Sequence, residues 1–211
     1  MTNNKKSQLT HRRNIGKTRR ITTTAILAAL AVVFMYLEFT LPFMPPFLKF
    51  DFSEIPALIA SFALGPVSAI IIELIKNIIH APLTGTMYIG EVSNFLTGSI
   101  FVGTAGIVYK KMRTRKGALV SMVVATIALA AFACPLNYFV NLPLYESVLG
   151  MPMDVIVGMS NAVNPMVTSK FTLIMWAFLP FNVFKGIVIS AITFIVYKPI
   201  SSLINNVSKK D

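Results

Sequence analysis

Three short clusters of Lys and Arg, separated by long apolar runs, constrain this chain more than any other feature of its sequence. Fifteen of its 19 basic residues lie within residues 5–20, 110–116 and 198–210. Cytoplasmic flanks of transmembrane helices carry such an excess of Lys and Arg, whereas the segments that cross the bilayer carry few charges. The pattern therefore predicts a multi-pass membrane protein with both termini and the loop at 110–116 on the cytoplasmic side.

The composition agrees with a bilayer environment. Hydrophobic residues make up 55% of the chain and charged residues only 13%, with a mean hydropathy of +0.71. A net charge of +11 can indicate a nucleic-acid partner, but here the charge lies in the flanks of apolar segments. We therefore expect membrane lipid as the surroundings and no nucleic-acid partner. The single Cys134 excludes an internal disulfide.

The fold class expected is an all-α integral membrane protein with six transmembrane helices. Six is an even number, as two cytoplasmic termini require. A basic N-terminal segment (1–20) and a C-terminal tail (201–211), both cytoplasmic, would flank a transmembrane domain at 21–200. Apolar runs and Pro/Gly punctuation place the helices at residues 21–40, 54–64, 67–79, 91–109, 118–140 and 168–197.

The segment Leu41–Leu48 carries three prolines and is apolar. Because proline removes an amide donor and disfavours helix in the preceding residue, we expect an extended loop. Lys49, Asp51 and Glu54 are expected on its exposed side, and Ser53 as the N-cap of the next helix. The two helices that follow are short, which leaves room for a cavity near one membrane surface.

Amides and one lysine are the strongest candidates for ligand binding. Asn137 and Asn141 share a helix face, with Tyr145 just beyond them, and Asn182 and Lys185 share another face deep in an apolar segment. Amides donate and accept hydrogen bonds without charge, which suits a neutral heterocycle. Helix capping or interhelical bonding remains an equal alternative for either Asn137 or Asn141. Lys185 needs a partner or a ligand oxygen, because an unpaired charge there is costly.

Glu73, Lys76 and His80 share one face of the third helix. An ion pair between Glu73 and Lys76, with His80 at the interface, is the simpler interpretation. An intramembrane enzyme built on the three residues is the alternative from another class of function. With two histidines in the whole chain and no HExxH, GxSxG, Walker A or CxxC motif, we expect neither a catalytic nor a metal site.

The first helix carries Ala25 and Ala29 four residues apart, with Ala28 beside them. Such small residues let another helix approach closely, either within the bundle or from a partner subunit.

These elements together resemble the substrate-binding S components of energy-coupling factor (ECF) transporters, most closely the riboflavin-specific ones. The resemblance covers nearly the whole chain. It rests on the Ala25-xxx-Ala29 helix, the loop Leu41–Leu48, Asn137-Tyr138-Phe139 with Pro143-Leu144-Tyr145, and Pro180-Phe181-Asn182-xx-Lys185-Gly186.

The resemblance implies a six-helix bundle in the cytoplasmic membrane that captures riboflavin from outside beneath the first loop. Riboflavin would be a transported ligand, with no cofactor and no enzymatic activity. A transmembrane coupling subunit and two ATP-binding-cassette ATPase subunits would dock against the first helix at Ala25, Ala28 and Ala29. An S component for a different vitamin or precursor is the alternative within this class.

The resemblance also implies ligand contacts. Asn182, Lys185 and Asn137 would hydrogen-bond the ligand, although Asn141 fits the role of Asn137 equally well. Leu41 and Met44 would line the site and Phe43 would stack. Pro180 offers only its carbonyl, and Tyr145 completes the expected binding residues.

Overall fold

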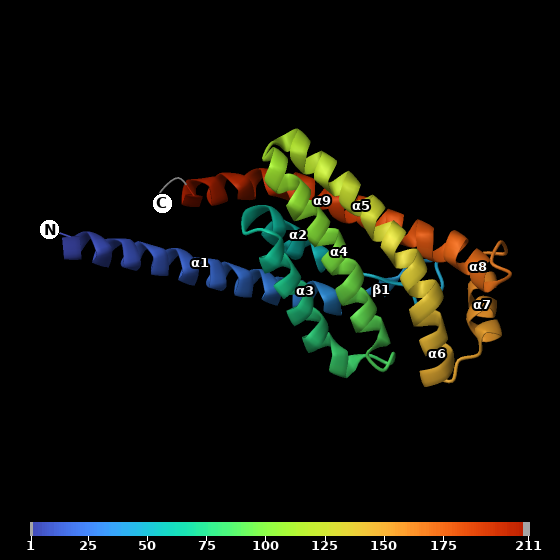
Figure 1. Cartoon of the computed structure of the whole chain (residues 1–211). Helices are drawn as coiled ribbons and strands as arrows, with labels where there is room; N and C mark the ends of the chain where they lie inside the picture. Colours follow the sequence, from blue (N-terminus) through green and yellow to red (C-terminus); the bar gives the residue numbers. More distant parts are fainter. Residues whose placement is uncertain (1, 209–211) are drawn as a thin grey trace.

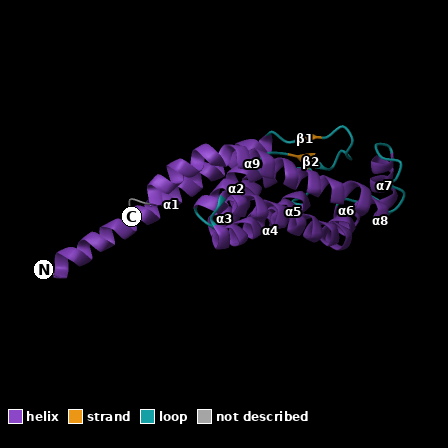
Figure 2. Ribbon diagram, turned by 90° about the horizontal axis from the view of Figure 1, so that it is seen from above, coloured by secondary structure: helices purple, strands orange, loops and turns teal. Residues whose placement is uncertain are grey.

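The computed structural model describes residues 2–208, and side chains over residues 16–196. The chain folds into an elongated helical bundle, from which the first helix projects beyond the other helices (Figure 1). Both described termini lie toward the same end of the molecule, and a small β-hairpin (residues 39–50) and α7 (Met153–Asn161) lie toward the other end (Figures 1 and 2). The expected tail at 201–211 extends past the described residues.

Five helical segments among the described residues are long and apolar enough to cross a membrane. The other apolar helix of some length, α2, spans only Glu54–Ala63. The five spans are Gly16–Tyr36, Pro66–Leu83, Ile89–Met112, Arg115–Val148 and Lys170–Val196. The long helices that carry them are α1 (Thr2–Tyr36), α3 (Pro66–His80), α4 (Ile89–Met112), α5 (Arg115–Leu136) and α9 (Leu179–Ser208).

The last two spans each contain a five-residue π-helical turn. One turn covers Asn137–Asn141 and joins α5 to α6 (Leu142–Val148). The other covers Ile174–Phe178 and joins α8 (Lys170–Leu173) to α9. Residues 141–167, which the sequence predicts as the connection between these spans, instead contain all of α6 and of α7 (Met153–Asn161).

The short helix α2 lies at the centre of the bundle, in contact with α1, α3, α4 and α9. Its residues from Glu54 to Ser61 are all buried, which explains why it is apolar all round rather than amphipathic. Gly65, at φ +96°, ends this helix, and Pro66 begins α3, as the sequence predicts. Because α2 is short, the space beyond its N-terminus is open to side chains from the neighbouring helices.

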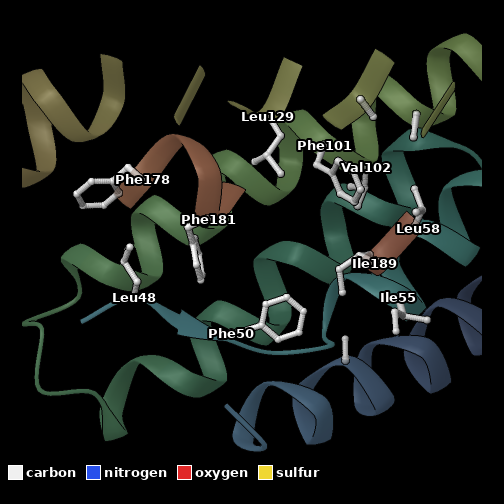
Figure 3. Close-up of a cluster of buried hydrophobic side chains, with 14 of the residues drawn as sticks. Leu48, Phe50, Ile55, Leu58, Phe101, Val102, Leu129, Phe178, Phe181 and Ile189 are labelled. Atoms are coloured by element: carbon white, nitrogen blue, oxygen red, sulfur yellow. The ribbon is translucent and has the colours of Figure 1, made fainter. Parts of the chain in front are cut away.

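The core continues from α2 toward the β-hairpin. Buried Leu58, Phe101 and Val102 occupy one side of it, and Phe178, Phe181 and Leu48 gather at the other side (Figure 3). Phe50, a residue of the hairpin, is 2% exposed, and the centroid of its ring lies 5.8 Å from that of Phe184 on α9. These apolar side chains bring the hairpin against α9.

The expected first helix is too long at its C-terminal end. It ends at Tyr36, and Phe39–Thr40 form β1, which pairs antiparallel with β2 at Lys49–Phe50. The expectation of an extended Leu41–Leu48 loop is also wrong. The segment makes two turns, with Met44 N–H bonded to Leu41 O and Leu48 N–H to Pro45 O. Each turn has a proline at its second position, where the fixed φ of proline favours a turn.

Candidate functional site

A cavity of about 130 Å³ lies where the hairpin meets the helices. Its wall combines aromatic and aliphatic side chains with a few polar groups, as in sites for small organic ligands. The hairpin contributes Phe47, Leu48 and Lys49; α2 contributes Glu54; α4 contributes Gly90, Ser93, Asn94, Thr97, Gly98 and Phe101; α5 to α6 contribute Leu129, Asn137, Asn141 and Tyr145; the last span contributes Phe178, Phe181, Asn182, Lys185, Gly186 and Ile189.

Five of the residues that the sequence singles out for ligand binding meet in this cavity: Asn137, Asn141, Tyr145, Asn182 and Lys185. They come from two spans that adjoin through the contact of α5 with α9. Four of them, all but Tyr145, are buried. Buried polar side chains that face a shared cavity are suited to fix the orientation of a ligand.

The other four residues expected to bind the ligand do not line the cavity: Leu41, Phe43, Met44 and Pro180. Phe43 is 56% exposed and stacks edge-on against Phe184. Leu41 and Met44 lie in the first turn of the hairpin loop, where Met44 is buried in the core. Pro180 lies in the first turn of α9, and its neighbour Phe181 faces the cavity in its place.

The amides are held by the helices that carry them. Asn182 Nδ2 donates to Phe178 O at 2.8 Å, and Asn137 Nδ2 donates to Ala133 O at 2.7 Å. Asn141 Nδ2 donates to Asn137 Oδ1 at 2.9 Å and to Ser93 Oγ on α4 at 2.7 Å. With their NH₂ groups bonded to protein, Asn141 and Asn182 keep carbonyl oxygens that can accept from a ligand N–H.

Lys185 has protein partners that the sequence does not indicate. Its Nζ lies 3.1 Å from Asp51 Oδ2 and 2.9 Å from Glu54 Oε1. The expectation that Asp51 and Glu54 lie on an exposed surface is wrong, since they are 3% and 4% exposed, and of the three residues expected there only Lys49 is exposed. The ammonium group needs a counter-charge in an apolar surrounding, and these carboxylates supply it.

The expected ion pair between Glu73 and Lys76 is present at 2.9 Å, and both side chains are fully buried. Lys76 also lies 3.2 Å from Glu54 Oε1 and donates to Ser53 Oγ at 2.6 Å. Ser53 occupies the N-cap position of α2 as expected, but its side chain makes no capping hydrogen bond. The hydroxyl instead satisfies a buried ammonium, which is the more costly group to leave unpaired.

His80 does not bond to Glu73 or Lys76 but pairs with a different acid, Glu91. Its Nδ1 is 3.1 Å from Glu91 Oε1, and the other oxygen of Glu91 accepts from Thr86 at 3.1 Å. The three residues considered for catalysis thus belong to two separate pairings. Among the described residues, no group of three or more His, Cys, Asp or Glu side chains is placed to hold a metal ion.

The alanines of the first helix divide between two faces. Ala28 is 3% exposed and packs in the core, where it is not accessible to another subunit. Ala25 and Ala29 are exposed and lie within the first candidate span. Ala25 and Ala29 form the face of α1 that is open to another helix.

Sequence reasoning missed several residues of the cavity. Ser93, Asn94 and Thr97 on α4 line it, and Phe178 lies in the π-helical turn before α9. The recurrence of small polar residues along one stretch of an apolar helix is a signal for the α4 residues. The partners of Lys185 were also missed, because their burial follows from a contact with a distant helix.

Comparisons with known proteins identify the family to which the chain belongs. A profile of the family described as "ECF transporter, substrate-specific component" matches residues 19–197. The riboflavin transporter RibU of Staphylococcus aureus (strain TCH60) is 33% identical over 194 residues, covering 92% of this chain and 96% of the relative. The riboflavin transporter FmnP of Bacillus subtilis (strain 168) is 33% identical over 184 residues, covering 86% and 91%.

The fold is likewise similar to a solved structure. The S component of a bacterial ECF transporter superposes with a TM-score of 0.71 at 34% sequence identity, covering 89% of this chain and 98% of that one. The family match extends over the hairpin, the cavity and nearly all of the five candidate spans. The chain therefore belongs to the family of substrate-specific components of ECF transporters.

Proposed function

We propose that this chain captures riboflavin and serves as the substrate-specificity subunit for its uptake across the cytoplasmic membrane. The observation that carries the proposal is the cavity in which buried Asn137, Asn141, Asn182 and Lys185 face apolar and aromatic walls. Riboflavin has a flat uncharged ring system with several acceptor and donor atoms, and this wall offers matching groups. The relatives named as riboflavin transporters support the same ligand.

In the proposed arrangement, α2 joins the five candidate spans to make six transmembrane segments within residues 21–200. The basic segment 1–20 and the tail 201–211 lie in the cytoplasm, in keeping with the positive charge on both. The chain is a binding subunit rather than an enzyme, and riboflavin is its transported ligand rather than a cofactor. A transmembrane coupling subunit and two ATP-binding-cassette subunits supply the energy and contact α1 at Ala25 and Ala29.

We assign ligand contacts to the five predicted residues that line the cavity, namely Asn137, Asn141, Tyr145, Asn182 and Lys185. Contacts from Leu41, Phe43 and Met44 require the hairpin loop to move relative to its position in the structure. A contact from Pro180 requires its carbonyl to turn toward the cavity.

The test is a titration of the full chain, purified in detergent, with riboflavin. We expect quenching of flavin fluorescence that saturates at one riboflavin per chain. Biotin and thiamin serve as competitors that are not expected to release the flavin. Absence of quenching, or release by another vitamin at equal concentration, would remove riboflavin as the ligand and leave the family assignment unaffected.

A further inference from the structure

Five buried charged residues form a continuous chain of alternating sign behind the cavity. Asp51 lies 3.1 Å from Lys185, which lies 2.9 Å from Glu54. Glu54 in turn lies 3.2 Å from Lys76, which lies 2.9 Å from Glu73. The chain of charges runs from the base of the hairpin through the cavity wall into α3. Of these five residues, Glu54 and Lys185 line the cavity.

Asp51 holds its place independently of the ligand. The backbone N–H of Ser53 donates to Asp51 Oδ1 at 2.7 Å, which leaves Oδ2 for Lys185. Burial acts to raise the pKa of Asp51, but the charges of Lys185 and Lys76 and the hydrogen bonds from Ser53 outweigh it and lower the pKa to about 2. The carboxyl group is therefore ionised at neutral pH.

Glu54 is held by a second lysine in addition to Lys185. Its Oε1 is shared between Lys185 and Lys76, and Lys76 is anchored in turn by Ser53 and Glu73. Two carboxylates, those of Asp51 and Glu54, thus both contact the Lys185 ammonium. Because an ammonium has three N–H groups, two matched by carboxylates leave one for a ligand in the cavity.

The charges also limit which ligand groups fit. The single positive charge of Lys185 is opposed by two carboxylates, one of them shared with Lys76. This corner of the cavity therefore offers no net positive charge to an anion. A neutral acceptor, such as a ring carbonyl, can take the remaining N–H without bringing a further negative charge next to Asp51 and Glu54.

We propose that Asp51 and Glu54 are positioning residues that hold the Lys185 ammonium charged and aimed into the cavity, and that their pairing selects a neutral carbonyl-bearing ligand over an anionic one. This inference rests on the proposed function. Asp51, at the base of the hairpin, would thus affect binding through Lys185 rather than by contact with the ligand. Preorganised donors of this kind raise affinity because the side chain is already ordered before binding.

The experiment is a double-mutant cycle in the full chain in detergent, made of the wild type, Asp51→Asn, Lys185→Gln and the double variant. Riboflavin affinity, the visible absorption spectrum of bound riboflavin and the unfolding temperature are measured for each. We expect Asp51→Asn to weaken binding about tenfold or more, the scale of one charge-assisted hydrogen bond. Its bound-flavin spectrum should shift toward that of Lys185→Gln, and it should have no further effect in the Lys185→Gln background.

Matched substitutions control for loss of an acid in general. Asp154→Asn on α7 and Glu146→Gln on α6 remove exposed carboxylates and should leave affinity and spectrum unchanged. Glu54→Gln should behave like Asp51→Asn, and Asp51→Glu, which keeps the charge, should retain more affinity than Asp51→Asn. An Asp51→Asn protein with unchanged affinity and spectrum, or one whose effect adds to that of Lys185→Gln, overturns the proposal.

Failure to fold is also informative. Removing one partner of a buried pair is strongly destabilising, whereas removing both is better tolerated. If Asp51→Asn does not fold, the double variant should, and a double variant that also fails overturns the pairing. If the wild type binds no riboflavin, the proposed function fails, and the coupling of Asp51 with Lys185 is then judged from the four unfolding temperatures alone.

Discussion

Lys185 Nζ lies 3.1 Å from Asp51 Oδ2, although 134 residues separate the two in the chain. The pair joins the base of the hairpin to the middle of the last span. The lysine for which the sequence predicts either a partner or a ligand oxygen is thus one member of a buried ion-pair network. The consequences of substitution at Lys185 therefore include stability as well as binding.

Replacing Lys185 with Ala should lower both riboflavin affinity and stability. Asp51 and Glu54 would lose their shared counter-charge, which costs on the order of 3–5 kcal/mol when a buried pair is broken. Thermal unfolding of the ligand-free variant in detergent measures this effect separately from binding. A variant that melts at the wild-type temperature would show that these carboxylates do not depend on Lys185.

Replacing Asn182 with Ala should act mainly on the ligand. Its amide nitrogen donates to Phe178 O of its own helix, so the packing between helices loses little. We expect binding to weaken by about 1–3 kcal/mol, the cost of leaving a buried ligand group unsatisfied. Ser121→Ala, which removes a buried hydroxyl of α5 outside the cavity, is the control. Equal affinities in the two variants would exclude Asn182 from the site.

Gly98→Ala should destabilise the protein, because a Cβ at this position would overlap the Glu73 carboxylate. Glu73 is held by Lys76 and cannot move aside without disturbing the buried charges. Gly103→Ala on the same helix is the matched control, since its Cβ would meet only Ile70 Cδ1 at 3.7 Å. We expect a loss of about 1–3 kcal/mol for Gly98→Ala, as for other overpacked sites. Equal unfolding temperatures for the two variants would contradict the close approach of Glu73.

Bulky substitutions on α1 should separate transport from binding. Ala25→Leu and Ala29→Leu enlarge exposed positions, so we expect riboflavin affinity to persist in the isolated subunit while uptake by cells falls. Ala28→Leu enlarges a core position and should instead reduce stability by about 1–3 kcal/mol. Normal uptake with both exposed substitutions present would place the partner surface elsewhere.

The sequence predicts the helices well because apolar runs in this chain are punctuated by Gly, Pro and basic residues. Gly65 and Pro66, for example, separate α2 from α3 as expected. It also predicts five residues of the cavity wall, since amides and a lysine deep in apolar helices require polar partners, which a ligand cavity can provide. The sequence does not predict burial that depends on a partner far away in the chain, and Asp51 and Glu54 are the main examples. An acid beside a proline-rich loop suggests solvent exposure until its partner on a distant helix is known.

The loop shows a second kind of limit. Three prolines exclude a helix but are compatible with both an extended strand and successive turns. Pairing of Phe39 with Phe50 closes the hairpin and thereby selects turns. The local sequence excludes a helix, and the contact between Phe39 and Phe50 then selects turns over an extended segment.

The π-helical turn at Asn137–Asn141 gives this stretch one residue more than a regular α-helix would need. Deleting a single residue there would let α5 continue as a regular α-helix with i→i+4 hydrogen bonds. The same deletion would rotate Tyr145 by about 100° around the axis relative to the residues before the turn. Homologues that vary in length at this point would consequently present different side chains to the ligand, so the extra residue is a place where substrate preference can change without any change in the surrounding bundle.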